Sequence, residues 1–247
     1  MRRKIFSCLF WILVWEAVSR LVGNVFLLAG PVNTVTALVH LVHDSDFLYS
    51  ILNTSLHILC GFAAGSAAGI AAAVIAHNSR MFQDLMEPLV RVIKTIPVVS
   101  FVILLLIQVG SRMLSFWIPV LVVFPVLYLN TKAGLGAADI SMLEMTEVFD
   151  AGRIARIRLV YLPALRPYLL SAFSLSLGMC WKSGVAAEVI GQPLETIGNG
   201  LYRAKINLDT ARLFAWTLVI VLLSAAFEKA GMLILKKILT HRVKVCT

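Results

Sequence analysis

The sequence predicts an all-α protein, a polytopic membrane bundle of about six transmembrane helices. Of the 247 residues, 60% are hydrophobic and 14% are charged, and the mean hydropathy is +0.89. A soluble domain averages about half apolar and a quarter charged residues. The apolar residues also form separate runs, most of them near the roughly 20 residues that a helical crossing needs, and basic residues favour alternate connections. These observations together place the chain in a bilayer.

Six crossings would use about 120 residues, so a large extramembrane catalytic domain is excluded and residues 1–247 form a single transmembrane domain. The net charge of +9 is explained by topology, and no nucleic-acid partner is expected. The cysteines are scattered without metal-ligand spacing, which predicts inert thiols and no metal: Cys8, Cys60, Cys180 and Cys246.

The first span, residues 5–29, follows the basic start Arg2-Arg3-Lys4. Glu16 and Arg20 interrupt it and no cleavage site follows, which favours a retained span over a secretion signal. The polar connection from Pro31 to Phe47 has no Lys or Arg and is therefore placed outside. Its histidines and aspartates lack metal-ligand spacing, which favours a solvated loop.

The second span is residues 48–76, and the basic connection that follows it is cytoplasmic. The third, residues 94–109, is short and contains Pro97, so a tilted or broken helix is expected. The fourth, residues 113–130, follows a tight outer turn.

A long cytoplasmic stretch separates the fourth span from the fifth, residues 163–190. The connection 191–208 is placed outside although it contains Arg203 and Lys205, and the sixth span, residues 212–235, leads to a basic end. Six crossings with basic residues at both ends predict two cytoplasmic termini.

Small residues four apart in the second span, Gly61, Gly65 and Gly69, predict close packing on another helix. Asn53 and His57 share one face of this helix. They either line a polar path or hydrogen-bond a neighbouring helix, and the sequence leaves both open.

The fifth span presents a stripe of small residues that ends at a lysine: Ser171, Ser174 and Lys182. A lysine at the bilayer centre costs about 2.5 to 3.5 kcal/mol, so it should face water, an acid or a ligand. One interpretation places Lys182 and the stripe in a translocation cavity together with Glu188. The alternative is a snorkelling Lys182 and a hydrated Glu188 near the outer surface.

No phosphate-binding loop of the GxxxxGK[ST] type is present, so ATP and Mg are expected on another chain and no cofactor on this one. The cytoplasmic stretch predicts two short helices at about 139–161, with Met142, Met145 and Phe149 at helical spacing. An apolar knob with an acidic rim suits docking into a partner's groove. A hairpin lying on the membrane is the alternative.

These residues resemble the EAA loop of binding-protein-dependent ABC importer permeases, Glu-Ala-Ala, three residues, Gly, nine residues, Ile-x-Leu-Pro. Here the spacing is kept as Glu144-Met145-Thr146, Asp150 and Val160-Tyr161-Leu162-Pro163. Further matches resemble the nitrate/sulfonate/taurine branch: Gly30-Pro31 with Val35, residues 55–69, Lys94-Thr95-Ile96-Pro97 and residues 184–191.

The resemblance implies a type I ABC importer permease subunit in a bacterial inner membrane, paired with a second permease, usually a copy of itself. ABC ATPase subunits would hold a coupling helix in the loop, and an extracytoplasmic substrate-binding protein would deliver cargo. The coupling residues would be Glu144, Met145, Thr146, Phe149, Asp150 and Pro163.

Both alanines and the glycine of the pattern are replaced here. Aspartate tolerates the left-handed backbone region that a turn glycine adopts, so Asp150 keeps a turn plausible. The larger Met145 and Thr146 predict an ATPase with a wider or altered groove.

The sequence also allows two alternative functions to be compared with this one. An intramembrane enzyme would need His57, Lys182 and Glu188 to converge, and no helix places two of them on one face; no catalytic residue is therefore assigned. A secondary transporter would favour internal repeats, and none is readable.

For cargo, the resemblance implies a small anion or a thiamine-precursor-like solute, and the cationic Lys182 favours an anion.

Overall fold

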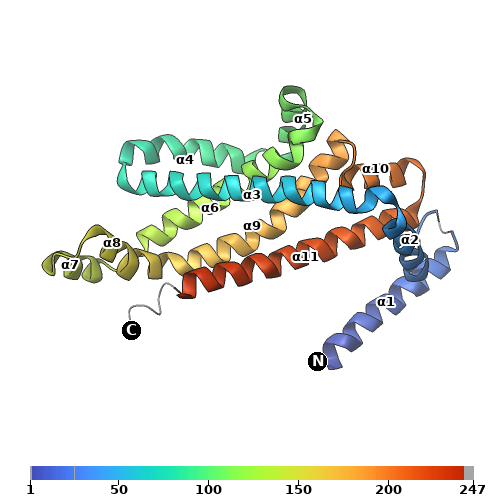
Figure 1. Ribbon diagram of the computed structural model, residues 1–247, viewed down its shortest axis with the longest axis horizontal. Coiled ribbons are helices and arrows are strands. Elements are labelled where there is room, and N and C mark those ends of the chain that lie inside the picture. Colours follow the sequence, from blue (N-terminus) through green and yellow to red (C-terminus); the bar gives the residue numbers. More distant parts are fainter. Residues whose placement is uncertain (1, 25, 242–247) are drawn as a thin grey trace.

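The computed structural model, which describes residues 2–24 and 26–241, is an elongated bundle of helices (Figure 1). The described residues form helices and no strand, which confirms the predicted all-α class. Arg242, Lys244 and Cys246 lie outside the described residues.

The chain begins with α1 (Arg2–Val22), α2 (Pro31–His43) and α3 (Ser45–Asn78). The first helix therefore ends earlier than the predicted span 5–29. Most of the connection expected after it is helical, because Pro31 stands at the first position of α2, where its missing N–H and fixed φ suit a helix start. Helix α1 is attached to the segment that precedes α2 by Trp15, whose Nε1 donates to the Ala29 carbonyl oxygen at 3.1 Å.

The third predicted span, residues 94–109, is divided between two helices, α4 (Arg80–Thr95) and α5 (Val98–Val109), which bend by 101° at their junction. Pro97 stands in this break, and the residue before a proline disfavours helical backbone. Ser79 begins α4 by accepting a hydrogen bond from the Phe82 N–H at 3.3 Å. A 3₁₀ turn, η1 (Ser111–Met113), then leads into α6 (Leu114–Gly136).

The stretch predicted to be cytoplasmic forms α7 (Ile140–Val148), α8 (Arg153–Arg156) and a π-helical segment, η2 (Ile157–Tyr161). The last part comprises α9 (Leu162–Gly191), α10 (Ile197–Ile206) and α11 (Thr210–His241). The connection 191–208 thus contains a helix that the sequence reading left out. Thr196 begins α10, its Oγ1 accepting a hydrogen bond from the Asn199 N–H at 3.2 Å.

Glycines in α3 bring its backbone against α6. A Cβ added at Gly65 would lie 2.9 Å from the Val120 carbonyl oxygen, and one at Gly69 would lie 2.7 Å from that of Phe124. Gly61 meets the Phe116 carbonyl in the same way. Because lipid supplies little hydrophobic drive for helix association, this close approach is what allows dispersion contacts to hold α3 and α6 together.

Three described helices are long and apolar enough to cross a membrane, namely α3, η1 with α6, and α11 up to Lys237. The bent pair α4 and α5 makes a fourth when it is counted as one span. Helix α9 has 30 residues but contains Arg166, Lys182 and Glu188. The six-span topology therefore stays a prediction.

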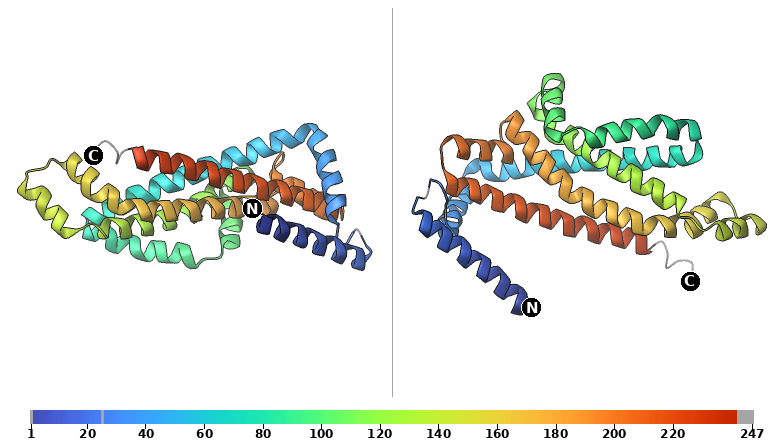
Figure 2. Two further views of the ribbon diagram at one scale, coloured as in Figure 1. Left: turned by 90° about the horizontal axis from the view of Figure 1, so that it is seen from below. Right: turned by 180° about the vertical axis from the view of Figure 1, so that it is seen from behind.

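Helices α3, α6, α9 and α11 run along the long axis of the bundle (Figure 1). One end is formed by α7 and α8, and the other by α2 and α10. Helix α1 extends away from the bundle in Figure 1 and in the right-hand view of Figure 2. The loop predicted for docking and the connection predicted to lie outside therefore occupy opposite ends of the molecule.

Candidate functional site

The loop at one end of the bundle is built around a tight helix terminus. Asp139 begins α7 by accepting a hydrogen bond from the Ser141 N–H at 2.9 Å. At the other end, the Ala151 N–H donates to the Thr146 carbonyl at 2.9 Å and the Asp150 N–H to that of Glu147 at 3.0 Å. This pair of bonds is the Schellman arrangement that ends a helix through one left-handed residue.

Asp150 is that left-handed residue, with φ of +46°. Gly152, two positions later, has φ of −57° and does not take this role. The replacement of the turn glycine by aspartate therefore leaves the turn itself intact.

The tip of this loop exposes large apolar side chains. Val148 is 82% exposed and Phe149 is 76% exposed, and their neighbours follow the same pattern. Seven such residues make up what we call the apolar tip: Ile140, Met142, Met145, Val148, Phe149, Ile154 and Ile157. The tip projects past the ends of α6 and α9 (Figure 1). Exposed apolar surface of this kind is typical of a protein or membrane contact.

The predicted docking residues differ in whether their side chains are exposed or buried. Met145 and Glu144 are exposed, whereas Thr146 is buried and its Oγ1 donates to the Leu143 carbonyl at 2.7 Å. Arg156 Nη2 lies 3.3 Å from Glu147 Oε1 and joins α8 to α7. Pro163 stands in the first turn of α9, directly after the π-helical segment. The tip is therefore connected to α9 through continuous helical backbone.

Two of the predicted pathway residues, Lys182 and Ser171, lie on the exposed side of α9. A Cβ added at Gly178, between them along the helix, would meet no atom within 4 Å. Ser174 is half-buried, and its Oγ donates to Glu228 Oε1 of α11 at 3.2 Å. Sequence reasoning did not single out Glu228; the available signal was a carboxylate inside the apolar sixth span.

Glu188 is fully buried, with 0% of its surface exposed, so the hydrated interpretation of this residue is wrong. Its Oε2 accepts hydrogen bonds from Thr54 Oγ1 at 3.0 Å and from the Gly198 N–H at 3.1 Å. Thr54 Oγ1 in turn accepts one from the Ile197 N–H at 3.0 Å. The carboxylate thus lies at the N-terminus of α10, where the helix dipole favours negative charge.

Asn53 does not contact His57 through a hydrogen bond in the described structure. Asn53 Nδ2 donates to the Glu195 carbonyl at 3.0 Å, and His57 Nδ1 is buried without a partner among the described residues. The six predicted pathway residues therefore divide between an exposed face of α9, its contact with α11, and the buried junction of α3, α9 and α10.

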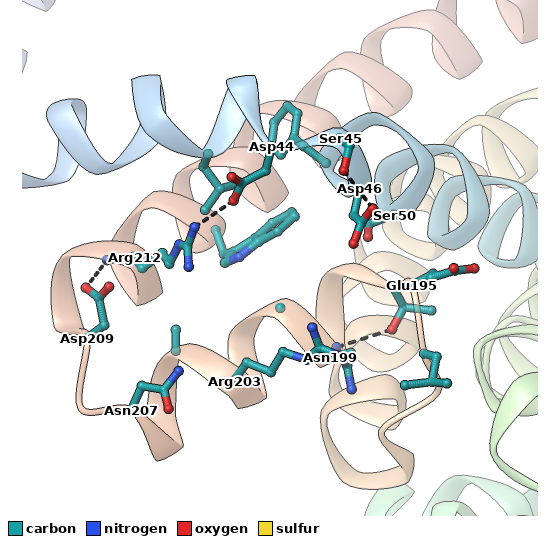
Figure 3. Close-up of a pocket in the computed structure, with 17 residues that line it drawn as sticks. Asp44, Ser45, Asp46, Ser50, Glu195, Asn199, Arg203, Asn207, Asp209 and Arg212 are labelled. Atoms are coloured by element: carbon teal, nitrogen blue, oxygen red, sulfur yellow. Dashed lines mark hydrogen bonds and ion pairs between the residues drawn. The ribbon is translucent and has the colours of Figure 1, made fainter.

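A polar cavity of about 550 Å³ opens at the α10 end of the bundle (Figure 3). Figure 3 shows Arg203 and Asn199 of α10 opposite Asp46 and Ser50 of α3. Arg212 Nη2 lies 2.6 Å from Asp44 Oδ2 on the adjoining wall. Glu195 and Asp209 add further carboxylates, so acids outnumber arginines around the opening. We call this cavity the outer pocket.

The described residues contain no group of three or more His, Cys, Asp or Glu placed to hold a metal ion. Lys182 is exposed on α9 while Glu188 is buried beside α10. A bundle of long apolar helices, with an exposed apolar tip at one end and a polar pocket at the other, defines the class of helical membrane proteins with surfaces for contact at both ends.

The comparisons with known proteins identify the family. The chain belongs to the family described as binding-protein-dependent transport system inner membrane component, whose model matches residues 65–244. It is an ABC transporter permease, and the family resemblance derived from the sequence is confirmed.

Relatives with named cargo are similar over much of the chain. The putative aliphatic sulfonates transport permease protein SsuC of Bacillus subtilis (strain 168) is 26% identical over 235 residues, which cover 94% of this chain and 84% of the relative. The nitrate import permease protein NrtB of Synechocystis sp. is 24% identical, covering 60% and 54%. The bicarbonate transport system permease protein CmpB of Synechococcus elongatus is 22% identical, covering 63% and 56%.

Proposed function

We propose that this chain is the pathway-forming subunit of an ATP-driven importer and that it pairs with a second copy of itself. Two ATPase subunits hold the α7–α8 loops, and closure of the ATPases on ATP moves the loops together. Rigid helices transmit the movement, so that the pathway opens outward to accept cargo and reverses after hydrolysis. The protruding apolar tip is the observation that supports this mechanism, because a large exposed apolar surface is typical of a contact with a partner.

Two substitutions in the EAA-like pattern affect the partner differently. Thr146 faces inward and satisfies its hydroxyl within α7, so its extra atoms do not reach a partner. Met145 faces outward and is 51% exposed. The ATPase groove must therefore accommodate Met145 where the pattern has an alanine, which supports a dedicated ATPase partner.

The docking proposal is tested with Met145→Asp and Phe149→Asp, singly and together. A carboxylate in an apolar groove is desolvated without a partner, so the permease should lose the ATPases during purification, and uptake in cells should fall to background. Met81→Asp is the matched control, since Met81 is 86% exposed at the start of α4, outside the tip. Full uptake and full ATPase retention in the double variant would contradict the proposal.

The outer pocket is the proposed contact for the extracytoplasmic binding protein. Its charged rim suits a soluble receptor that binds transiently. Interface rims are polar, and their charges mainly affect the rate of association. Asp46→Lys should reduce receptor stimulation of ATP hydrolysis while receptor-free hydrolysis is unchanged. The matched control is Asp84→Lys on α4, an exposed acid at the other end.

The proposed cargo is a small anion. The relatives named for sulfonates, nitrate and bicarbonate support this class, and Lys182 provides a cation on the exposed face of α9. Lys182→Glu should lower uptake of an anionic cargo, and Lys182→Arg should retain it. If Lys182→Glu transports the anion as well as the unchanged protein, Lys182 is not a cargo contact.

A further inference from the structure

A basic cleft of about 390 Å³ lies between α4 and α6, away from the tip and the outer pocket. Its charged lining consists of Arg91 and Lys94 of α4, Lys132 of α6 and the single carboxylate of Glu87. Thr95 and Tyr128 also line it. The mechanism described above uses none of these residues.

The charges in this cleft are unbalanced. Lys132 Nζ lies 2.6 Å from Glu87 Oε1, so these two groups neutralise each other. Arg91 and Lys94 have no ion-pair partner in the part of the chain that the structure describes. Two positive charges therefore remain beside a cavity large enough for a small anion or a headgroup.

One residue in the wall of the cleft also has a buried polar atom without a hydrogen-bond partner. Tyr128 is fully buried, and its hydroxyl has no partner among the described residues. A buried polar group without a partner is costly, and ligands or water usually satisfy it. This observation is independent of the charge count.

The position of the cleft along α6 indicates its depth in the bilayer. Helix α6 begins at Leu114, and a rise of about 1.5 Å per residue places Lys132 about 27 Å further along. The apolar core of a bilayer is about 30 Å thick, so with the predicted orientation the cleft would lie where the cytoplasmic leaflet meets water. Another side of helix α4 exposes Leu85, Leu89 and Val92. This apolar side is suited to contact with lipid acyl chains.

We propose that the α4–α6 cleft binds an oxyanion, with Arg91 and Lys94 as its cationic contacts. The phosphate of an anionic phospholipid and a small soluble oxyanion share this chemistry. Basic pockets between membrane helices on the cytoplasmic side are suited to acidic headgroups. The proposal gives a role to Lys94-Thr95 of the Lys94-Thr95-Ile96-Pro97 match, and it does not depend on the ATPase or on the identity of the cargo.

The test uses the full chain purified in neutral detergent and the variant Arg91→Gln/Lys94→Gln. In the first arm, native mass spectrometry measures binding of phosphatidylglycerol against phosphatidylcholine. In the second, thermal unfolding is followed during titration with sulfate and with methanesulfonate. Arg91 and Lys94 each add to the binding free energy of an anionic ligand. Losing both charges should therefore weaken binding about 30-fold.

Two further variants separate charge from folding. Arg91→Lys/Lys94→Arg keeps both charges and should retain binding. Lys236→Gln/Lys237→Gln removes the same charge from exposed positions on α11 and should leave binding unchanged.

The outcomes decide both the site and its ligand. Loss of phosphatidylglycerol binding only in the cleft variant assigns a lipid headgroup, and loss of sulfate or methanesulfonate stabilisation only in that variant assigns a soluble oxyanion. Equal binding by the cleft variant and the α11 variant in both arms overturns the proposal. Arg91 and Lys94 would then serve only the C-terminal dipole of α4 and the inward bias of positive charge.

Discussion

Among single side chains, the buried Glu188 connects two helices that are far apart in sequence. One carboxylate oxygen receives hydrogen bonds from Thr54 of α3 and from the Gly198 N–H at the start of α10. Gly198 permits this, because a Cβ there would overlap Glu188. Glu188 therefore fixes the connection between α9 and α11 against the bundle.

Glu188→Ala should destabilise the protein. Removing the acceptor leaves two buried donors unpaired, which costs about 1–3 kcal/mol. The measurement is thermal unfolding of the purified permease in detergent. Glu195→Ala, which removes an exposed carboxyl group nearby, is the control and should leave the unfolding temperature unchanged. Equal unfolding temperatures for both variants would show that the Glu188 hydrogen bonds contribute little.

Asp150 gives a second prediction at the turn of the docking loop. A β-branched residue in left-handed backbone costs about 1–2 kcal/mol more than glycine, so Asp150→Val should open the turn and lower uptake. Asp150→Gly should retain uptake, because glycine adopts this conformation freely. Transport assays on cells with matched expression test this. Normal uptake by Asp150→Val would mean that the turn is not required for coupling.

Between elements, the contact of α3 with α6 depends on the absence of side chains at three positions. Gly65 faces the Val120 backbone, whereas Ala67 of the same helix is exposed. Gly65→Leu should therefore separate the two helices, at a cost of about 1–3 kcal/mol from overpacking. Ala67→Leu places the same side chain on the exposed side and should have little effect.

The readout is the yield of folded permease and its unfolding temperature in detergent. A Gly65→Leu protein as stable as Ala67→Leu would show that the backbone approach does not hold the pair together. Only small residues on α3 allow its backbone to approach that of α6 so closely.

At the level of the complete chain, the two ends of the bundle should face opposite sides of the membrane. In a background without the native cysteines, Leu194→Cys should react with an impermeant maleimide in intact cells, because it lies on the connection placed outside. Val148→Cys should react only after permeabilisation. Both side chains are exposed, at 68% and 82%. The reverse labelling pattern would contradict the predicted orientation.

Much of the architecture could be predicted because it depends on composition and local pattern. The apolar runs fixed where most long helices lie, and Pro97 marked the break that separates α4 from α5. The residues from Glu144 to Pro163 predicted two short helices at a turn, which the structure has, and the tolerance of aspartate for left-handed backbone anticipated the conformation of Asp150. These features involve residues that are close in sequence.

The candidate site was less predictable, because it depends on contacts between distant residues. Residue spacing on α9 placed Glu188 near the outer surface, but only the return of α10 onto α3 shows that it is buried. Likewise, nothing local links Ser174 to Glu228, 54 positions later. Glu228 lies within the apolar run of the sixth span, and the local pattern did not single it out.

By itself, the sequence determined that this is a helical membrane protein of the importer permease family, and it predicts a docking loop. Hydropathy, charge bias and motif spacing are properties of neighbouring residues. Only the tertiary structure decided which polar groups are buried, which apolar side chains form the exposed tip, and that Arg91, Lys94 and Lys132 surround one cleft. These depend on how helices far apart in the chain pack, which local patterns do not encode.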